Sequence, residues 1–476
     1  MSSRNGILVI LFVTAWRILF LAFDRTDLFV DEAQYWLWSQ HLDLGYYSKP
    51  PMIAWILSAV TAVLGSDSNF AIRVAGPLLH MLNAFALMAF ARQVAGDRAV
   101  GWTGATYVTL PAVGLSSWLF STDVPLILFA TLGLWAYIGL TKARSVPLAI
   151  LMGAAVGLAF LSKYAVLFLV PGGAAAMALL PSARISVRDF ALAVVVAGLV
   201  AAPNLVWNLT HDITTVRHTQ DIAHWSDLKL NLSGAVEFFL AQFAVVGPII
   251  FSAMLWASWL VIRKRGDVTR RHLFWLSMPV IALITLQALL AKAYANWAVL
   301  AYIAGAVMAV SLLQNKWPRG LRISLAINGA LCLILPVLLV VAPDLRLPNG
   351  RLVLERYLGR SEMSREIARI AGREELTTIV SDNRDVLADL FHTMRDSSLK
   401  FRARPPTGFP DNYYEQTLAL SADTAGPVLY VSRRPLTCDG TDVPAVTELA
   451  PEDGYYRNRG LKAYRVDAEC LRTGIN

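Results

Sequence analysis

The sequence predicts an α-helical polytopic membrane protein with a small α/β domain at its C-terminal end. Three observations support this fold class. First, 56% of the 476 residues are hydrophobic and 16% are charged, whereas soluble domains carry about 25% charged residues. Second, apolar runs approaching the ~20 residues that cross a bilayer recur along most of the chain. Third, the composition changes after Pro343, where Arg, Asp and Glu become frequent.

The apolar runs predict about eleven transmembrane helices. They lie near residues 6–24, 70–91, 100–120, 124–140, 146–161, 164–180, 190–209, 238–262, 272–291, 295–314 and 320–342. Ile7–Phe23 has no small-residue cleavage site and is expected to stay as the first span. The apolar stretch 52–65 is short, and hydropathy alone allows either a span or an interfacial helix.

Positive charge decides how 52–65 is placed, because cytoplasmic loops carry an excess of Lys and Arg. If 52–65 is a juxtamembrane helix in a long first external loop, all the strongly basic loops fall on the cytoplasmic side with the N-terminus. These loops carry Arg92, Arg98, Lys142, Arg144, Arg184, Arg188, Arg263, Lys264, Arg265, Arg270, Arg271, Lys316, Arg319 and Arg322. The same topology accounts for the net charge of +8 without a nucleic-acid partner.

Residues 1–342 are therefore expected to form the transmembrane domain and residues 343–476 an external α/β domain, periplasmic in a Gram-negative cell. Strand-like runs at Leu376–Val380, Val428–Ser432 and Ala463–Val466 alternate with a helical stretch near Arg384–Met394. Cys438 and Cys470 lie in this domain. An oxidising compartment would allow a disulfide between them, but sequence leaves its geometry open.

Two adjacent carboxylates, Asp31 and Glu32, follow the first span at the outer membrane boundary. A carboxylate there can act as a general base on a hydroxyl nucleophile, or bind a metal. The alternative is structural: Asp31 caps a helix that begins at Ala33, and Glu32 lies at the favourable positive end of that helix. The local sequence does not separate the two interpretations.

Further along the same loop, Tyr46-Tyr47-Ser48-Lys49-Pro50-Pro51 places one ammonium beside two tyrosines. A compact ammonium suits a phosphate, and the prolines can start the next helix at Pro51. An interfacial aromatic belt with a snorkelling lysine is the alternative. It explains Trp36 and Trp38 well but leaves the Lys-Pro-Pro sequence without a reason.

Other external segments offer polar groups that could meet an anionic or saccharide ligand. Basic residues are scarce on this side, and a snorkelling lysine is the ordinary alternative for each of them. Asp123, in Ser-Thr-Asp-Val-Pro, also fits an ordinary helix N-terminus. The amide- and aromatic-rich segments could equally pack as loops. The candidates here are Arg73, Asp123, Lys163, Asn204, Trp207, His211, Arg217, His218, Lys292 and Asn296.

Several function classes lack a signal. The sequence contains no Walker A loop and no G-x-G-x-x-G motif after a strand. ATP-driven transport and soluble nucleotide-sugar binding are therefore not indicated. The histidines show no H-x-x-x-H or similar ligand spacing, so a metal site has weak support.

An acidic pair after the first span, an aromatic loop ending in Lys-Pro-Pro, and an outer Thr-Asp at the next external turn resemble the GT-C glycosyltransferases. The likeness runs through Met1–Ala342. More narrowly, the sequence is similar to the bacterial branch related to protein O-mannosyltransferases. This branch includes lipid A aminoarabinose transferases and the galacturonosyltransferases of lipid A and lipopolysaccharide core. The short gap between Asp31 and Lys49, and the run Glu-Ala-Gln-Tyr-Trp-Leu-Trp, resemble the galacturonate-transferring members more.

The resemblance implies a sugar donor on polyprenyl phosphate, a lipid A or lipopolysaccharide acceptor, an inverting reaction, and an active site on the periplasmic side of the inner membrane. It implies no metal, no other cofactor and no obligate protein partner. Lys163, in Leu-Ser-Lys-Tyr, matches a lysine at the corresponding turn of the aminoarabinose branch. If the sugar is a uronate, Arg73, Arg217 or Lys292 is expected near its carboxylate.

The residues expected at the site divide into three groups. The catalytic or orienting carboxylates are Asp31, Glu32 and Asp123; the donor-phosphate ligands are Lys49, Lys163 and Arg73; the substrate contacts are Tyr35, Tyr46, Tyr47, Asn204, Trp207, His211, Arg217, His218, Lys292 and Asn296. A flippase for a lipid-linked sugar is the competing hypothesis. It would need no catalytic carboxylate, and it would tend to carry internal repeats, which the sequence lacks. A non-catalytic membrane scaffold would leave the acidic pair and Lys-Pro-Pro without a role.

Overall fold

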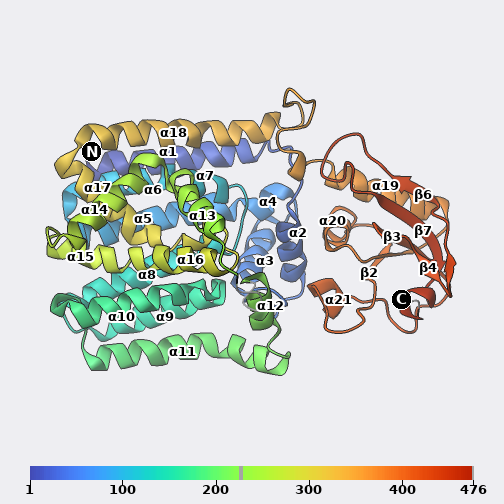
Figure 1. Cartoon of the computed structure of the whole chain (residues 1–476), viewed down its shortest axis with the longest axis horizontal. Helices are drawn as coiled ribbons and strands as arrows, with labels where there is room; N and C mark the ends of the chain where they lie inside the picture. Colours follow the sequence, from blue (N-terminus) through green and yellow to red (C-terminus); the bar gives the residue numbers. More distant parts are fainter. Residues whose placement is uncertain (224–228, 474–476) are drawn as a thin grey trace. The chain divides into compact units, whose positions relative to one another are not determined.

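The computed structural model describes residues 1–223 and 229–473. The chain forms two compact units (Figure 1). The first, called here the membrane unit, comprises Met1–Phe23, Lys49–Ile56 and Arg73–Val337. The second, called here the sheet unit, comprises Asp24–Ser48, Leu57–Ile72 and Leu338–Asn476. Residues of the first external loop therefore cluster with the C-terminal part of the chain, which the sequence did not predict.

The membrane unit is built from helices, and each predicted span falls on one helix or on two successive helices. They are α1 (Ser3–Leu21), α5 (Ala75–Ala95), α6 (Asp97–Thr109), α7 (Pro111–Ser116), α8 (Asp123–Lys142), α9 (Val146–Ser162), η1 (Tyr164–Phe168), α10 (Leu169–Leu179), η2 (Pro181–Ala183), α11 (Val187–Thr210), α12 (Thr214–Ala223), α13 (Leu232–Val246), α14 (Pro248–Ile262), α15 (Val268–Trp275), α16 (Met278–Leu290), η3 (Ala295–Ala298), α17 (Ala301–Lys316) and α18 (Pro318–Val341).

Six helical segments in the described part of the chain are long and apolar enough to cross a membrane by themselves. A bent pair, α13 with α14, raises the number to seven. Several other apolar helices, such as α9, are shorter. The multi-pass helical fold is thus confirmed, whereas the number of eleven spans stays a prediction.

The predicted single span at 238–262 is not one straight helix, because the chain bends by 116° between α13 and α14. The bend falls at Gly247, which has a φ of 88° and lies against Asn328. A Cβ atom there would lie 2.3 Å from the Asn328 Oδ1 atom, so only glycine fits. Pro248 follows, and it lacks the N–H that would continue the preceding helix.

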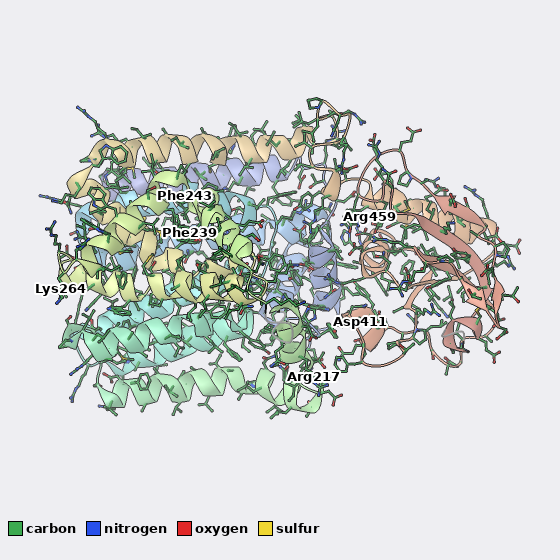
Figure 2. The ribbon with its side chains drawn as sticks, in the orientation of Figure 1. Arg217, Phe239, Phe243, Lys264, Asp411 and Arg459 are labelled. Atoms are coloured by element: carbon green, nitrogen blue, oxygen red, sulfur yellow. A yellow bond between two sulfur atoms is a disulfide. The ribbon has the colours of Figure 1, made fainter. Side chains whose placement is uncertain are left out.

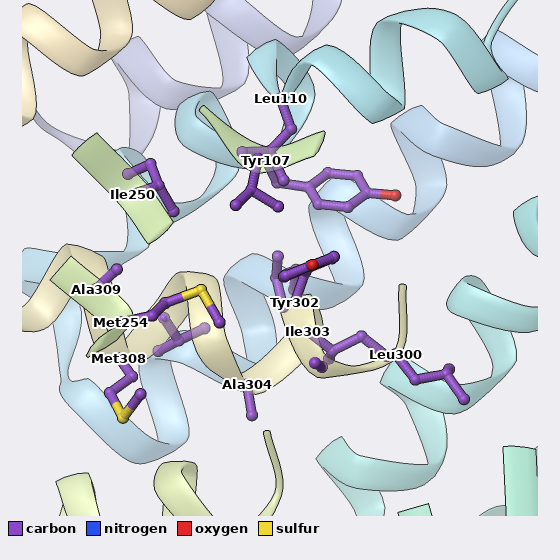
Figure 3. Close-up of a cluster of buried hydrophobic side chains, with 14 of the residues drawn as sticks. Tyr107, Leu110, Ile250, Met254, Leu300, Tyr302, Ile303, Ala304, Met308 and Ala309 are labelled. Atoms are coloured by element: carbon purple, nitrogen blue, oxygen red, sulfur yellow. The ribbon is translucent and has the colours of Figure 1, made fainter. Parts of the chain in front are cut away.

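Close helix packing in the membrane unit relies on small residues. Gly153 and Gly157 lie on the side of α9 that meets α11, and added Cβ atoms would come within 2.4 Å of Ala193 O and 2.6 Å of Val200 Cβ. Such small-residue contacts let helix backbones approach in membranes. Elsewhere, Met254, Ile303 and Met308 pack in the main buried cluster, shown in Figure 3.

The two ends of the membrane unit carry different residues. Figure 2 shows Lys264 at one end and Arg217 at the other. Lys264 belongs to a basic loop that was predicted to be cytoplasmic, and Arg217 to a segment that was predicted to be external. Their separation agrees with the charge-based topology.

The sheet unit contains the predicted α/β domain. Its five-stranded sheet has the order β2-β1-β3-β7-β6, with β1 parallel to β2 and β3, and β7 antiparallel to β3 and β6. The strands are β1 (Thr378–Ser381), β2 (Lys400–Ala403), β3 (Pro427–Ser432), β6 (Thr447–Leu449) and β7 (Leu461–Asp467), and β4 (Thr437–Cys438) pairs with β5 (Thr441–Asp442). The helices are η4 (Glu355–Tyr357), α19 (Arg360–Arg373), α20 (Arg384–Thr393), α21 (Tyr413–Thr417) and α22 (Cys470–Thr473). The three predicted strands and the predicted helix are confirmed.

Side chains alternate between the two faces of the sheet, as the strand period of two requires. In β3, Leu429 and Val431 belong to the cluster packed with α19 and α20. Val428 and Tyr430 belong to a second cluster on the opposite face. Cys438 and Cys470 form a disulfide with their Cα atoms 5.6 Å apart, so the pairing that the sequence left open is present.

A buried ion pair lies in the interior of the sheet unit. Arg360 donates to both carboxylate oxygens of Asp389, at 3.1 and 3.0 Å, and the two side chains are 1% and 3% exposed. The Tyr456 hydroxyl donates to Asp389 at 2.6 Å. The guanidinium carbon of Arg360 lies 3.7 Å from the centre of the Tyr455 ring. Aromatic rings and a second donor therefore compensate the cost of burying these charges.

Three helices arise from the first external loop: α2 (Val30–Gln40), α3 (Met52–Leu64) and α4 (Asn69–Arg73). The stretch 52–65 thus forms a helix of its own, and it begins directly after Pro50-Pro51, as predicted. Within the sheet unit, α2 packs against α20. This contact places Asp31, the second residue of α2, next to the C-terminal domain.

Candidate active site

The best-formed polar cluster of the membrane unit surrounds Asp123. The Lys163 ammonium donates to Asp123 Oδ1 at 2.7 Å, and Asn296 Nδ2 donates to Asp123 Oδ2 at 2.7 Å. The Asp123 and Lys163 side chains are 9% and 19% exposed. Three residues predicted separately from different turns are therefore brought together, each at or beside the end of a helix.

Local sequence explains how each member is placed. Asp123 is the first residue of α8, so its carboxylate also lies at the favourable N-terminal end of a helix. Lys163 follows the last residue of α9 in an extended conformation, which ends that helix and turns the side chain out of it. Asn296 lies in η3, just before α17. The helix-terminus interpretation and the site interpretation of Asp123 are thus compatible.

A second polar group lies at the C-terminal end of α11. The Tyr164 hydroxyl donates to Asn204 Oδ1 at 2.8 Å and accepts from Asn208 Nδ2 at 3.0 Å. The indole of Trp207 stacks on the His211 ring with centroids 4.2 Å apart. Asn204 is buried and used within this network, so the geometry favours a structural role for its side chain.

The remaining predicted cations of the membrane unit lie on different helices and loops. Lys49 is half-buried just ahead of the two prolines. Arg73 is fully buried, with its guanidinium carbon 5.4 Å from the centre of the Trp118 ring. Arg217 is exposed on α12 beside the half-buried His218. The exposed Lys292 has its ammonium 4.7 Å from the Tyr294 ring centre.

In the sheet unit, Asp31 forms an ion pair with Arg384. Arg384 Nη2 lies 2.5 Å from Asp31 Oδ1, and Arg384 Nε donates to Gln34 Oε1 at 2.8 Å. The Arg384 and Asp31 side chains are 34% and 44% exposed, so this pair is open to solvent. Sequence analysis predicted Asp31 but missed Arg384 and Gln34, since no local motif marks them.

Glu32 differs from its neighbour. It is 2% exposed, and its carboxylate accepts a hydrogen bond at 3.0 Å from the backbone N–H of Phe29, which precedes α2. A Glu side chain that accepts a hydrogen bond from the residue before its helix satisfies one of the backbone N–H groups that have no partner within the helix. The geometry therefore favours a structural role for Glu32 at the positive end of α2 over a catalytic one. The predicted cap at Asp31 is wrong, because α2 begins at Val30 and Asp31 lies within its first turn.

The tyrosines of the loop are buried. The Tyr46 hydroxyl donates to the carbonyls of Trp38 and His41 and accepts from Asp43 N–H, all at 3.0–3.1 Å. Burial raises the pKa of Tyr46, which keeps the hydroxyl a donor. Tyr47 donates to the carbonyl of Pro410, and Tyr35 packs 5.3 Å from the Trp38 ring. These contacts shape the loop.

Within 1–223 and 229–473, no group of three or more His, Cys, Asp or Glu side chains is placed to hold a metal ion. The charged side chains that form ion pairs at the two sites are carboxylates, one lysine ammonium and one guanidinium.

Comparison with known proteins defines the class to which this architecture belongs. The fold is similar to the crystal structure of ArnT from Cupriavidus metallidurans bound to undecaprenyl phosphate, with a TM-score of 0.67 and 13% identity over 98% of both chains. Residues 48–207 match the family described as dolichyl-phosphate-mannose-protein mannosyltransferase. The chain therefore has the GT-C fold that its motifs indicated.

Sequence relatives narrow the assignment. The chain is 57% identical over 472 residues to the lipid A galacturonosyltransferase RgtD of Rhizobium johnstonii, covering 99% of this chain and 100% of that protein. It is 30% identical over 184 residues to the lipopolysaccharide core galacturonosyltransferase RgtA of the same organism, covering 37% and 36% of the two chains. The chain belongs to the family of these GT-C glycosyltransferases, and it is a membrane glycosyltransferase. The flippase and scaffold hypotheses are thereby set aside.

Proposed function

We propose that this enzyme transfers galacturonic acid from a polyprenyl-phosphate donor to lipid A or the lipopolysaccharide core. The identity of 57% over nearly the whole chain with a lipid A galacturonosyltransferase carries the proposal. The reaction takes place at the periplasmic face of the bacterial inner membrane, with 1–342 as the membrane-embedded part and 343–476 as the periplasmic domain. The Cys438–Cys470 disulfide supports an oxidising compartment for that domain.

The donor phosphate is held by lysines in this proposal. The bond between the anomeric carbon and the phosphate oxygen breaks, and polyprenyl phosphate leaves with the electron pair. Ammonium groups in a partly water-excluded site stabilise the charge that develops on the leaving oxygen. Lys49 and Lys163 take this role, and attack from the opposite face of the sugar inverts the anomeric centre.

The Lys163–Asp123 pair supports a resting state that the donor would change. Lysine is a compact charge on a flexible stem, so its ammonium can move from a carboxylate to a nearby phosphate. Asp123 would then keep its hydrogen bond from Asn296, 2.7 Å away. Lys163 is neutralised until an anionic donor competes for it.

Asp31 acts on the acceptor. A hydroxyl acceptor loses its proton as its oxygen bonds to the anomeric carbon, and a carboxylate within hydrogen-bond reach can take that proton. The half-exposed Asp31 fits this role better than the buried and capped Glu32. If the acceptor atom is a phosphate oxygen, no proton is removed and Asp31 orients the acceptor.

The test is transfer by the purified enzyme in proteoliposomes that contain polyprenyl-phosphate galacturonate and a lipid A precursor. Asp31→Asn should lower the rate by about 10²–10⁴-fold, the usual contribution of a general base, and Lys49→Ala should abolish transfer. Asp43→Asn, in the same loop, serves as the matched control. Product mass spectrometry reads the result. Full transfer by the Asp31→Asn enzyme would remove the role given to that residue, and a wild-type enzyme that forms no galacturonate-bearing product would refute the galacturonate donor.

A further inference from the structure

We infer that Arg384 is a positioning residue for the transfer reaction, supplied by the C-terminal domain and acting through Asp31. The inference rests on the role proposed above for Asp31. Arg384 follows Asp31 by 353 positions in the sequence, and no local motif marks it. Its assignment comes from the geometry of the sheet unit alone.

Two donors of one guanidinium hold two residues of α2. Arg384 Nη2 contacts Asp31 Oδ1 at 2.5 Å, and Nε contacts Gln34 Oε1 at 2.8 Å. Asp31 and Gln34 are three positions apart and share one side of the helix. Because the guanidinium is planar and rigid, contacts through two of its nitrogens fix its orientation, and with it the direction of the Asp31 carboxylate.

The fold places Arg384 with precision. Strand β1 ends at Ser381, and α20 begins at Arg384. The Asn383 side chain caps this helix by accepting from Asp385 N–H at 3.0 Å. The carboxyl ends of parallel strands are where α/β sheets commonly bind ligands. Arg384 thus lies at the start of α20, directly after the short connection from β1, beside the parallel part of the sheet.

Other contacts hold the loop on the sheet unit without Arg384. Trp36 donates to Asp67 at 2.9 Å, and its ring meets His392 edge-on at 5.0 Å. Trp38 packs against Tyr413 at 5.7 Å. Tyr47 donates to the Pro410 carbonyl at 2.8 Å. Loss of the guanidinium should therefore leave α2 docked while its carboxylate loses a fixed partner.

The solvent exposure of the Arg384–Asp31 ion pair distinguishes it from an ion pair that stabilises the fold. With side chains 34% and 44% exposed, the Arg384–Asp31 pair contributes little to folding stability. The guanidinium does fix the direction of the Asp31 carboxylate, which a group that acts on the acceptor requires. Control of a reactive carboxylate is therefore a better reason for this contact than stabilisation of the fold.

The test compares Arg384→Ala, Arg384→Lys and Arg465→Ala in the full-length reconstituted enzyme. Arg465 is a suitable control because it forms a similarly exposed pair with Glu374, at 3.2 Å, in the same unit. We expect Arg384→Ala to lower kcat by 10- to 100-fold, with KM for the donor and the melting temperature nearly unchanged. Arg384→Lys should keep an intermediate rate, and millimolar guanidinium should restore part of the Arg384→Ala activity. The Arg465→Ala enzyme should match the wild type.

The outcomes separate this inference from the proposed function. If Asp31→Asn abolishes transfer while Arg384→Ala keeps full activity, the inference is overturned and the proposed function stands. If Arg384→Ala loses activity together with its melting temperature, and neither lysine nor guanidinium restores it, Arg384 is structural and the inference also fails. If Asp31→Asn is fully active, the role of Asp31 fails first.

Discussion

Two charged clusters, one in each unit, pair an aspartate with a cation in different ways. Asp389 and Arg360 are almost completely buried, and they are enclosed by Tyr455 and Tyr456. Asp123 is held by a lysine that is 19% exposed and by an exposed amide, Asn296. The first cluster is closed and its guanidinium is fixed by several partners. The second has one flexible cation that can exchange ligands, which is what binding an anionic substrate requires.

The largest effect is expected in the closed cluster. Arg360→Ala leaves Asp389 buried without its cation, and breaking such a pair costs about 3–5 kcal/mol. Denaturant unfolding of the purified protein, followed by the fluorescence of the sheet unit, measures this loss. The double variant Arg360→Met with Asp389→Leu should recover most of the stability, because apolar groups can replace a buried pair. A single variant with unchanged stability would contradict the structural role of the cluster.

In the open cluster the main loss should be in activity. Lys163→Met removes a charge that we propose to stabilise the departing phosphate, and removal of one such group usually costs about 10²–10³ in kcat. Single-turnover transfer in proteoliposomes measures the rate. Lys229→Met, a change to an exposed lysine of the membrane unit, is the control. If Lys163→Met lowers the stability of the protein but the folded fraction is fully active, Lys163 has a structural role. The Lys163–Asp123 cluster then does not differ in this respect from the Arg360–Asp389 cluster.

The smallest effect tests the hydrogen bond between Asn296 and Asp123. Asn296→Ala removes one donor from a carboxylate that keeps its lysine, and a hydrogen bond to a charged group contributes about 1.5–3 kcal/mol. Because Asn296 is exposed, we expect the lower end, roughly a tenfold loss of kcat/KM. Asn315→Ala, whose side chain bonds only within α17 at 3.0 Å, is the control. An unchanged kcat/KM would show that Lys163 alone positions Asp123.

The sequence predicted the features that depend on neighbouring residues. Apolar runs located the helices, and short strand-like runs located strands such as that at Val428–Ser432. The orientation of the helices, taken from charge asymmetry, stays a prediction. Asp123, Lys163 and Asn296 were each predicted from their own turns, but their meeting was not, because 173 positions separate Asn296 from Asp123. Arg384 was missed for the same reason, since nothing near it in sequence distinguishes it from other surface arginines.

The break at Gly247 shows another limit. A run of apolar residues from 238 to 262 has the composition of one span, and hydropathy does not show where a helix changes direction. The Gly-Pro pair at its centre was the available signal, because glycine adopts a positive φ and proline ends the preceding helix. A Gly-Pro pair inside an apolar run therefore predicts a break in the helix, as it does between two runs.

The order of strands in the sheet has a consequence for biosynthesis. Strand β7 lies between β3 and β6, so the sheet cannot close until residues 461–467 have been made. Asp31 is synthesised hundreds of residues earlier, and at 5–20 residues per second its arginine partner follows after roughly 20–70 s. During that interval a nascent chain carries the carboxylate without the guanidinium and without a finished platform for α2. A partly translated or truncated enzyme would therefore be inactive, and the enzyme could catalyse transfer only after its translation is complete.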